Sequence, residues 1–281
     1  MILLDNNQII LANMFNSLKQ DPIISEDLLR HLVLNSYRYF RKSFHNEYGE
    51  LVICQDSPHS WRKTFFPEYK ASRAKNKAKS PYDWKEIYRI LDLLRGEVME
   101  NFPYKDIKVV SAEADDIIAV LTKHYHQSEN ILIVSNDKDF QQLQTYPNVK
   151  QYSTFKRDYM ICEDSYAFLV EHIIRGDNSD GIPNILSDDD SFIDENKRQK
   201  RMTEKTLGEI SKEVPVIDKT KYARNWDRNR TLIDFTKIPE DLENNILAEF
   251  KKPKAVETRC KILPYMVTHR LKNLIPSAEE F

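Results

Sequence analysis

Four short apolar runs, each followed within a few residues by an acid, constrain this chain more than any other feature. The runs are Ile2–Leu4, Leu51–Cys54, Ile107–Val110 and Ile131–Val134. Segments of helical periodicity separate them. Short buried strands that alternate with helices predict an α/β fold with a central, mostly parallel sheet flanked by helices. In such sheets, ligands bind outside the carboxyl ends of the strands.

Acidic residues collect at that carboxyl edge. Six of them follow an expected strand directly or after a short turn: Asp5, Asp56, Glu113, Asp115, Asp137 and Asp139. Two more, Asp177 and Asp180, lie on a tight loop after an expected helix over residues 163–175. These carboxylates would repel one another without counter-charge. Oxygen donors with no His or Cys in the set predict Mg²⁺, with Mn²⁺ as a substitute, and a pair of ions suits phosphodiester hydrolysis.

The segment from Ser111 to Leu121 is expected to begin a helix, with Ser111 as its N-cap and three acids in its first turn. Glu113 and Asp116 share a face with apolar residues that should point into the core. Buried carboxylates need a partner, and the segment contains no base. A solvated helix start is the usual explanation of one such triplet, but acids in equivalent places elsewhere argue against it.

Residues 61–79 have a different character, with seven basic residues, one acid and four interleaved aromatic residues. Bases that neutralise phosphates beside aromatic rings that stack on bases are typical of a nucleic-acid contact. The alternative is a solvated surface segment, which is the more common explanation for an isolated charge run. The bases are Arg62, Lys63, Lys70, Arg73, Lys75, Lys77 and Lys79.

Composition excludes several classes of protein. Only 5 glycines occur in 281 residues, and neither GxGxxG nor GxxxxGK[ST] is present, which argues against a dinucleotide site or a P-loop. The 3 cysteines are far apart, so we expect neither a disulfide framework nor a thiolate metal site. We find no signal peptide and no apolar run of membrane length, so a cytoplasmic protein is expected. An aspartyl phosphatase needs Asp-x-Asp after its first strand, whereas Asn6 and Asn7 follow Asp5.

The chain divides into two expected parts. Residues 1–160 form the α/β core and include a helical arch over residues 57–102. Residues 161–281 form a helical subdomain, with helices expected at 203–214, 239–251 and 254–274. Residues 187–201 contain almost no apolar side chain and are expected to be exposed or disordered.

Seven motifs together resemble the 5′-nuclease (flap endonuclease) family, with its PIN-like core, and within it the ribonuclease H type of bacteriophages. They are LLDNNQ around Asp5, VICQD ending at Asp56, WRKTFFPEYKASR from Trp61, AEADDIIAVL from Ala112, IVSNDKDFQQL from Ile133, YPNVKQYS from Tyr146 and GDNSDGIPN from Gly176. The segment LIDFTKIP from Leu232 adds to the likeness. The resemblance covers nearly the whole chain.

The resemblance implies roles for individual residues. Four acids match the family's first metal site, with Glu113 nearby: Asp5, Asp56, Asp115 and Asp137. Asp139, Asp177 and Asp180 match the second site. For Asp116, ligation and a supporting part remain open. Lys70 and Arg73 match the arch bases that hold the scissile phosphate, and Arg62 and Tyr69 match neighbours on the substrate side.

The resemblance also implies a task and its partners. The family cuts 5′ flaps and removes RNA or DNA from the 5′ ends of duplexes, so we expect an Mg²⁺-dependent 5′-to-3′ exonuclease and flap endonuclease that removes lagging-strand primers during phage replication. A monomer in the host cytoplasm is expected. No N-terminal clamp-binding extension precedes Asp5, so a sliding clamp or single-strand-binding protein would contact the C-terminal helices.

Two departures and two alternatives accompany this hypothesis. Gly181 replaces the usual Asn, and Ser187-Asp188-Asp189-Asp190 stands where most members have a Gly-rich helix-hairpin-helix, so duplex binding is expected to differ. A non-catalytic relative would have lost acids, and none is missing. A PIN-like ribonuclease that cuts single-stranded RNA would be shorter and would lack the arch.

Overall fold

The centre of the molecule is a six-stranded sheet. The structure, a computed structural model, describes residues 1–18, 25–194 and 196–281. The strand order is β3-β2-β1-β4-β5-β6, and the pairs are parallel except for β5 with β6, which confirms the predicted mostly parallel sheet. The strands are β1 (Ile2–Asp5), β2 (Leu51–Cys54), β3 (Lys105–Ile107), β4 (Ile131–Val134), β5 (Val149–Ser153) and β6 (Asp158–Met160).

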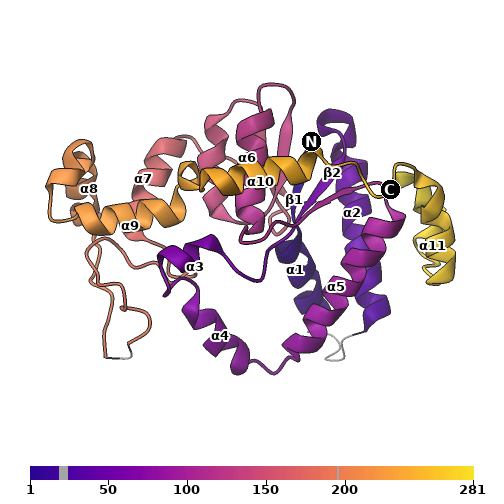
Figure 1. Ribbon diagram of the computed structural model, residues 1–281, viewed down its shortest axis with the longest axis horizontal. Coiled ribbons are helices and arrows are strands. Elements are labelled where there is room, and N and C mark those ends of the chain that lie inside the picture. Colours follow the sequence, from indigo (N-terminus) through magenta and orange to yellow (C-terminus); the bar gives the residue numbers. More distant parts are fainter. Residues whose placement is uncertain (19–24, 195) are drawn as a thin grey trace.

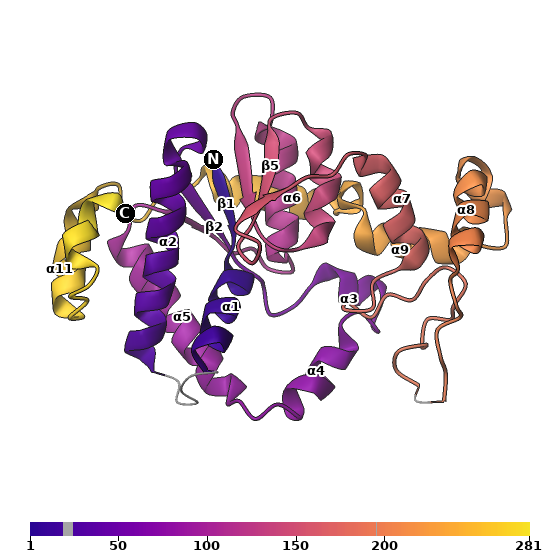
Figure 2. The ribbon, with the colours of Figure 1, turned by 180° about the vertical axis from the view of Figure 1, so that it is seen from behind.

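Helices cover both faces of the sheet, because successive strand residues point to opposite sides. Ile2 and Leu4 pack against α1 (Asn6–Leu18), α2 (Glu26–Tyr48) and α5 (Trp84–Asn101). Leu3 faces the other way, toward α6 (Ala114–Tyr125), the 3-10 helix η1 (Lys138–Thr145) and α10 (Glu240–Lys251). Figure 2 shows α1 and α2 on one side of the strands and α6 on the other.

A third core lies beside the sheet. Its helices are α7 (Ser165–Arg175), α8 (Glu204–Glu213) and α9 (Ala223–Ile233), with the 3-10 helices η2 (Val214–Lys219) and η3 (Phe235–Lys237) next to them. Phe66 and Tyr69, from the segment predicted to form the arch, are buried in this core. Apolar packing therefore holds the N-terminal part of that segment in place.

The predicted arch leaves the sheet after β2 and returns before β3. It contains α3 (Trp61–Phe65), α4 (Ala71–Ala78) and α5. Both views show α4 at the lower margin of the molecule, connected through α3 to the side of α7 and α9 and through α5 to the side of α2 (Figure 1, Figure 2). We call residues 57–102 the basic arch.

Two local predictions are wrong. The third strand ends at Ile107 rather than Val110, whose side chain is 82% exposed. Helix α6 begins at Ala114 with Glu113 as its N-cap, whereas Ser111 lies outside the helix with a φ of 68°. The cause is a capping box, in which the Asp116 carboxylate accepts the Glu113 backbone N–H at 2.9 Å.

The C-terminal part packs onto the rest of the chain. The helices predicted at 203–214 and 239–251 are α8 and α10. The predicted helix 254–274 is wrong: the 3-10 helix η4 (Arg259–Lys261) leads into α11 (Ile262–Thr268), and Arg270, at a φ of 55°, precedes the 3-10 helix η5 (Ile275–Glu280). Because residues beyond 160 contribute to all three cores, a division there stays a prediction.

The described part of segment 187–201 is exposed at Ile193 and at residues 196–198, as expected, but it also contacts α9. It forms neither helix nor strand, but Asp189 pairs with Arg228 at 2.6 Å. Arg228 is 5% exposed, and a buried guanidinium requires a counter-charge, which explains why the acidic loop folds onto it. Within the described residues, no helix lies between α7 and α8, in line with the predicted departure from a helix-hairpin-helix.

Cys54, Cys162 and Cys260 are free. Among the described helices, none combines the length and the apolar character needed to cross a bilayer.

Candidate active site

Three strand ends and one helix start bring four carboxylates to the same edge of the sheet. Asp5 is the last residue of β1, Asp56 lies two residues beyond β2 and Asp137 three residues beyond β4. Asp115 lies in the first turn of α6, and the Ala114 amide donates to Asp56 at 2.8 Å. The geometry thus connects β2 to the acidic helix. We call Asp5, Asp56, Asp115 and Asp137 the strand-end group.

The raised pKa values in the strand-end group indicate that its carboxylates lack a positively charged partner among the described residues. Burial and the neighbouring Asp56 raise the pKa of Asp5 to about 7. Burial and Asp139 raise the pKa of Asp137 to about 6. Burial, with Asp5 next, holds the pKa of Asp115 well above its usual range. Buried acids that raise one another's pKa favour a bound cation, and their oxygens are the donors that Mg²⁺ and Mn²⁺ prefer.

The other acids of α6 are neutralised by the basic arch. Arg62 lies 3.0 Å from Glu113 and 2.9 Å from Asp116. Lys70 lies 2.6 Å from Glu113, and the Tyr69 hydroxyl donates to the same carboxylate at 2.9 Å. Burial opposes ionisation of Glu113, but Lys70 and Arg62 outweigh it and hold its pKa at about 2. The missing partners of these buried acids are therefore bases some fifty residues earlier in the chain.

The four arch residues expected to contact nucleic acid separate into two kinds. Arg62 and Tyr69 are buried at 3% and 2% exposure, so here they support α6 and do not face a substrate. Lys70 and Arg73 reach Asp180, at 3.4 Å and 2.6 Å, and the Arg73 side chain is 50% exposed. The Lys70 side chain is 13% exposed, so Arg73 is the more accessible of these two bases.

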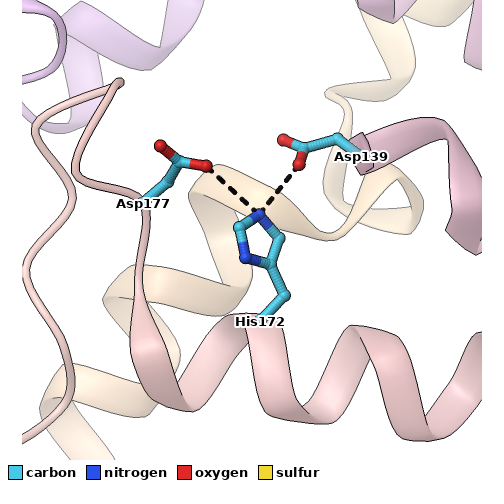
Figure 3. Close-up of side chains that lie close together, drawn as sticks. All are labelled: Asp139, His172 and Asp177. Atoms are coloured by element: carbon cyan, nitrogen blue, oxygen red, sulfur yellow. Dashed lines mark ion pairs between the residues drawn. The ribbon is translucent and has the colours of Figure 1, made fainter. Parts of the chain in front are cut away.

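The structure pairs Asp139 and Asp177, predicted for the second metal site, with a residue that the sequence did not single out. His172 Nε2 lies 2.9 Å from Asp139 and 3.5 Å from Asp177 (Figure 3). Ligand atoms of all three lie within 4.8 Å of one another, the only such set among the described His, Cys, Asp and Glu residues. We call these residues the histidine trio. The sequence feature that could have indicated His172 is its place in α7 directly before the buried residues Ile173 and Ile174.

Asp180, the third acid predicted for that site, turns toward the basic arch. Its side chain contacts Tyr69, Lys70 and Arg73, and its backbone carbonyl accepts the Lys70 amide at 2.7 Å. Gly181 follows with a φ of 72°, and a Cβ there would lie 3.2 Å from the Glu68 carbonyl. Backbone contacts therefore connect the arch to the loop after α7.

Residues outside the predicted set also shape the site. Asn7 donates to Asp56 at 2.7 Å, and Ser135 donates to Asp5 at 2.9 Å. Beside Asp177 lies a pocket whose lining includes four bases, Lys138, Arg175, Lys200 and Arg201. Lys138 reaches Asp177 at 3.0 Å. Positive charge therefore borders the acidic edge on two sides.

Comparison with known sequences covers the whole chain. The family described as 5′-3′ exonuclease, N-terminal resolvase-like domain, matches residues 1–168, and the family described as T4 RNase H, C terminal, matches residues 165–281. The ribonuclease H of Enterobacteria phage T4 is 30% identical over 291 residues, covering 99% of this chain and 95% of that protein. The flap endonuclease Xni of Shewanella oneidensis is 30% identical, covering 71% and 76%.

Solved structures share the fold. The 5′-exonuclease of phage T5 with bound zinc matches with a TM-score of 0.63 at 17% identity, covering 91% of this chain and 99% of that one. The phage T5 flap endonuclease in a pseudo-enzyme-product complex with DNA and metal ions matches with a TM-score of 0.64 at 18% identity, covering 89% and 99%. The predicted α/β class is confirmed. The chain belongs to the 5′-3′ exonuclease family, and it is a 5′-nuclease of the group that includes flap endonucleases and the phage T4 ribonuclease H.

Proposed function

We propose that this enzyme hydrolyses phosphodiesters near the 5′ ends of RNA–DNA hybrids and of branched or flapped DNA, with Mg²⁺ as its natural metal and Mn²⁺ as a substitute. One observation carries the proposal. The strand-end group gathers four carboxylates at one edge of the sheet, where burial and mutual repulsion raise the pKa of Asp5 and Asp137, and Lys70 of the basic arch lies 2.6 Å from Glu113, two residues before Asp115. An acidic centre for cations beside bases for a polyanion is the combination that phosphodiester hydrolysis needs.

We assign two divalent ions to these carboxylates. Asp5, Asp56, Asp115 and Asp137 would hold the first, and Asp139 and Asp177 the second. Asp180 would join the second site once its arch partners move away. Bound ions of this kind stabilise charge on the attacking and leaving oxygens of an in-line displacement. Glu113 has its oxygens occupied by Arg62, Tyr69 and Lys70, so we assign it to holding the arch bases, with ligation of the first ion dependent on their release.

The protein's own side chains position the substrate. Lys70 and Arg73 now pair with Glu113 and Asp180, and a phosphate in reach would compete for the same N–H groups. The pocket bases Lys200 and Arg201 lie beyond Asp177 and suit the backbone of the duplex. The arch would therefore hold the scissile phosphate, while the pocket beside Asp177 would hold another phosphate farther along the duplex.

A matched set of substrates tests this function. The protein is incubated with a 5′-labelled RNA–DNA hybrid, a 5′-flapped DNA duplex and free single-stranded RNA, each with Mg²⁺ and with EDTA. We expect Mg²⁺-dependent shortening of the hybrid and cutting of the flap. Faster cleavage of free RNA would favour the PIN-like alternative. Absence of cleavage with intact binding would favour the non-catalytic alternative.

We further propose that the enzyme works as a monomer in the host cytoplasm and removes lagging-strand primers during phage replication. Contact with a sliding clamp or a single-strand-binding protein would use the C-terminal helices. The side chains of Leu263 and Val267 on α11 support this assignment, because they are 49% and 58% exposed. Loss of binding to either partner protein after Leu263→Glu, with unchanged cleavage of naked hybrid, is the expected result, and unchanged binding would contradict it.

A further inference from the structure

The histidine trio contains a nitrogen donor where an all-oxygen set was expected. His172 belongs to α7, Asp139 to η1 and Asp177 to the loop after α7, so three separate segments converge on it (Figure 3). The His172 side chain is 5% exposed, and its Nε2 points between the two carboxylates. The imidazole of His172 is therefore buried, and one of its nitrogens is directed at the space between the two carboxylates.

Ion pairs join the polar atoms of the trio, and two of these atoms lack a hydrogen bond. Within the described residues, His172 Nε2 and Asp139 Oδ1 form an ion pair at 2.9 Å but make no hydrogen bond. One oxygen of Asp177 is taken by the Ser179 amide at 2.7 Å and the Asp180 amide at 3.2 Å, and the other faces His172 and Lys138. Buried polar atoms without hydrogen bonds are rare, and an ion placed between the three ligand atoms would satisfy His172 Nε2 and Asp139 Oδ1 together.

We propose that His172 Nε2 is a ligand of the second divalent ion, together with Asp139 and Asp177. The inference rests on the proposed function, because it assumes that this ion binds. Ligands at about 2.1 Å from a common ion lie about 3 Å apart when they are at right angles. The contacts of 2.9 Å and 3.5 Å from His172 match that spacing.

A nitrogen ligand changes which metal the site prefers. Imidazole binds later first-row divalent ions such as Mn²⁺ and Co²⁺ better than Mg²⁺, whereas carboxylates alone suit Mg²⁺. The two sites of this enzyme would then differ: the strand-end group would take Mg²⁺, and the histidine trio would take a transition metal more tightly. The competing role for His172 is that of a resident cation between two carboxylates, which would oppose every metal.

Electron spin-echo spectroscopy of the Mn²⁺-loaded protein tests the proposal, because it detects nitrogen bound to the metal. We expect a nitrogen signal in the native protein whose frequency changes when all histidines carry ¹⁵N. This labelling alters no residue, so the result does not depend on a variant that folds. Protein-bound Mn²⁺ without a nitrogen signal would overturn the inference and leave the proposed function intact. Absence of any bound Mn²⁺ would overturn both.

Two variants provide a matched comparison. His172→Gln removes the nitrogen ligand. His124→Gln changes an exposed histidine at the C-terminal end of α6 and serves as the control. We expect His172→Gln to lose the nitrogen signal and to bind Mn²⁺ about tenfold more weakly, with Mg²⁺ binding changed by less than about threefold. His124→Gln should behave like the native protein. Tighter Mg²⁺ binding by His172→Gln would show the resident-cation role and overturn the proposal.

Discussion

Arg62 Nη2 lies 2.9 Å from Asp116 Oδ1, and the Asp116 side chain is completely buried. The same guanidinium reaches Glu113 and donates to the Leu232 carbonyl at 2.8 Å. One residue of the basic arch thus connects α3, α6 and the end of α9. Arg62 therefore neutralises the buried carboxylates of Glu113 and Asp116 at the start of α6.

We predict that Arg62→Ala lowers the free energy of unfolding by about 3–5 kcal/mol, because it leaves buried carboxylates without their cation. Thermal or denaturant unfolding measures this loss. Lys63→Ala, an exposed neighbour, serves as the control and should change stability by less than about 0.5 kcal/mol. Unchanged stability with lost affinity for nucleic acid would instead support the substrate contact expected from the sequence.

Asp137→Asn is expected to reduce cleavage at least about a hundredfold while affinity for the hybrid stays close to normal, since the substitution removes metal-binding charge with little change of shape. Single-turnover cleavage and a binding titration in Ca²⁺ measure the two effects. Asp158→Asn, at an exposed position of β6, is the matched control. Near-normal turnover of Asp137→Asn would count against the strand-end group as a metal site.

The stability of the metal-free protein should depend on pH through Asp5. Its folded pKa is raised from 3.8 to about 7, so between these values the folded state binds more protons than the unfolded state. Asp5 therefore makes stability fall as pH rises from about 4 to about 7. We expect Mg²⁺ to raise the melting temperature more at pH 8 than at pH 5, where protons already occupy these carboxylates. An equal rise at both pH values would contradict this assignment.

Lys70→Ala and Arg73→Ala should each lower the rate of cleavage about a hundredfold and weaken binding only about threefold, because each contacts one phosphate among several. Comparison of kcat with KM separates the two effects. Lys79→Ala, exposed in the same arch, should leave the rate nearly unchanged. Weaker binding with normal turnover would assign both bases to general attraction of the polyanion.

The pocket beside Asp177 predicts a salt-dependent contribution to duplex binding. Replacing both Lys200 and Arg201 by Ala should reduce the slope of log affinity against log salt by about 1 to 2 and lower affinity equally for all sequences. Binding measured at several salt concentrations provides the slope. An unchanged slope would show that the duplex lies elsewhere.

The parts predicted well from sequence are those set by local pattern. The apolar runs place Asp5, Asp56 and Asp137 at strand ends, because parallel strands share a carboxyl edge. The partners of Glu113 and Asp116 could not be found this way, since Arg62 and Lys70 are distant in sequence and meet α6 only through tertiary packing. His172 was missed for a related reason, because a single histidine in a helix is usually structural. The expected helix over 254–274 failed because residues 254–258 are not helical and the chain turns at Arg270, where φ is 55°.

The backbone bond from Lys70 to the Asp180 carbonyl, with Gly181 close to Glu68, fixes the position of the near end of the arch without using any charge. These two backbone contacts do not depend on the side chains of Lys70 and Arg73. Exchanging Lys70 or Arg73 during evolution or engineering can alter which nucleic-acid strands the enzyme accepts, while the backbone that carries these side chains keeps its position.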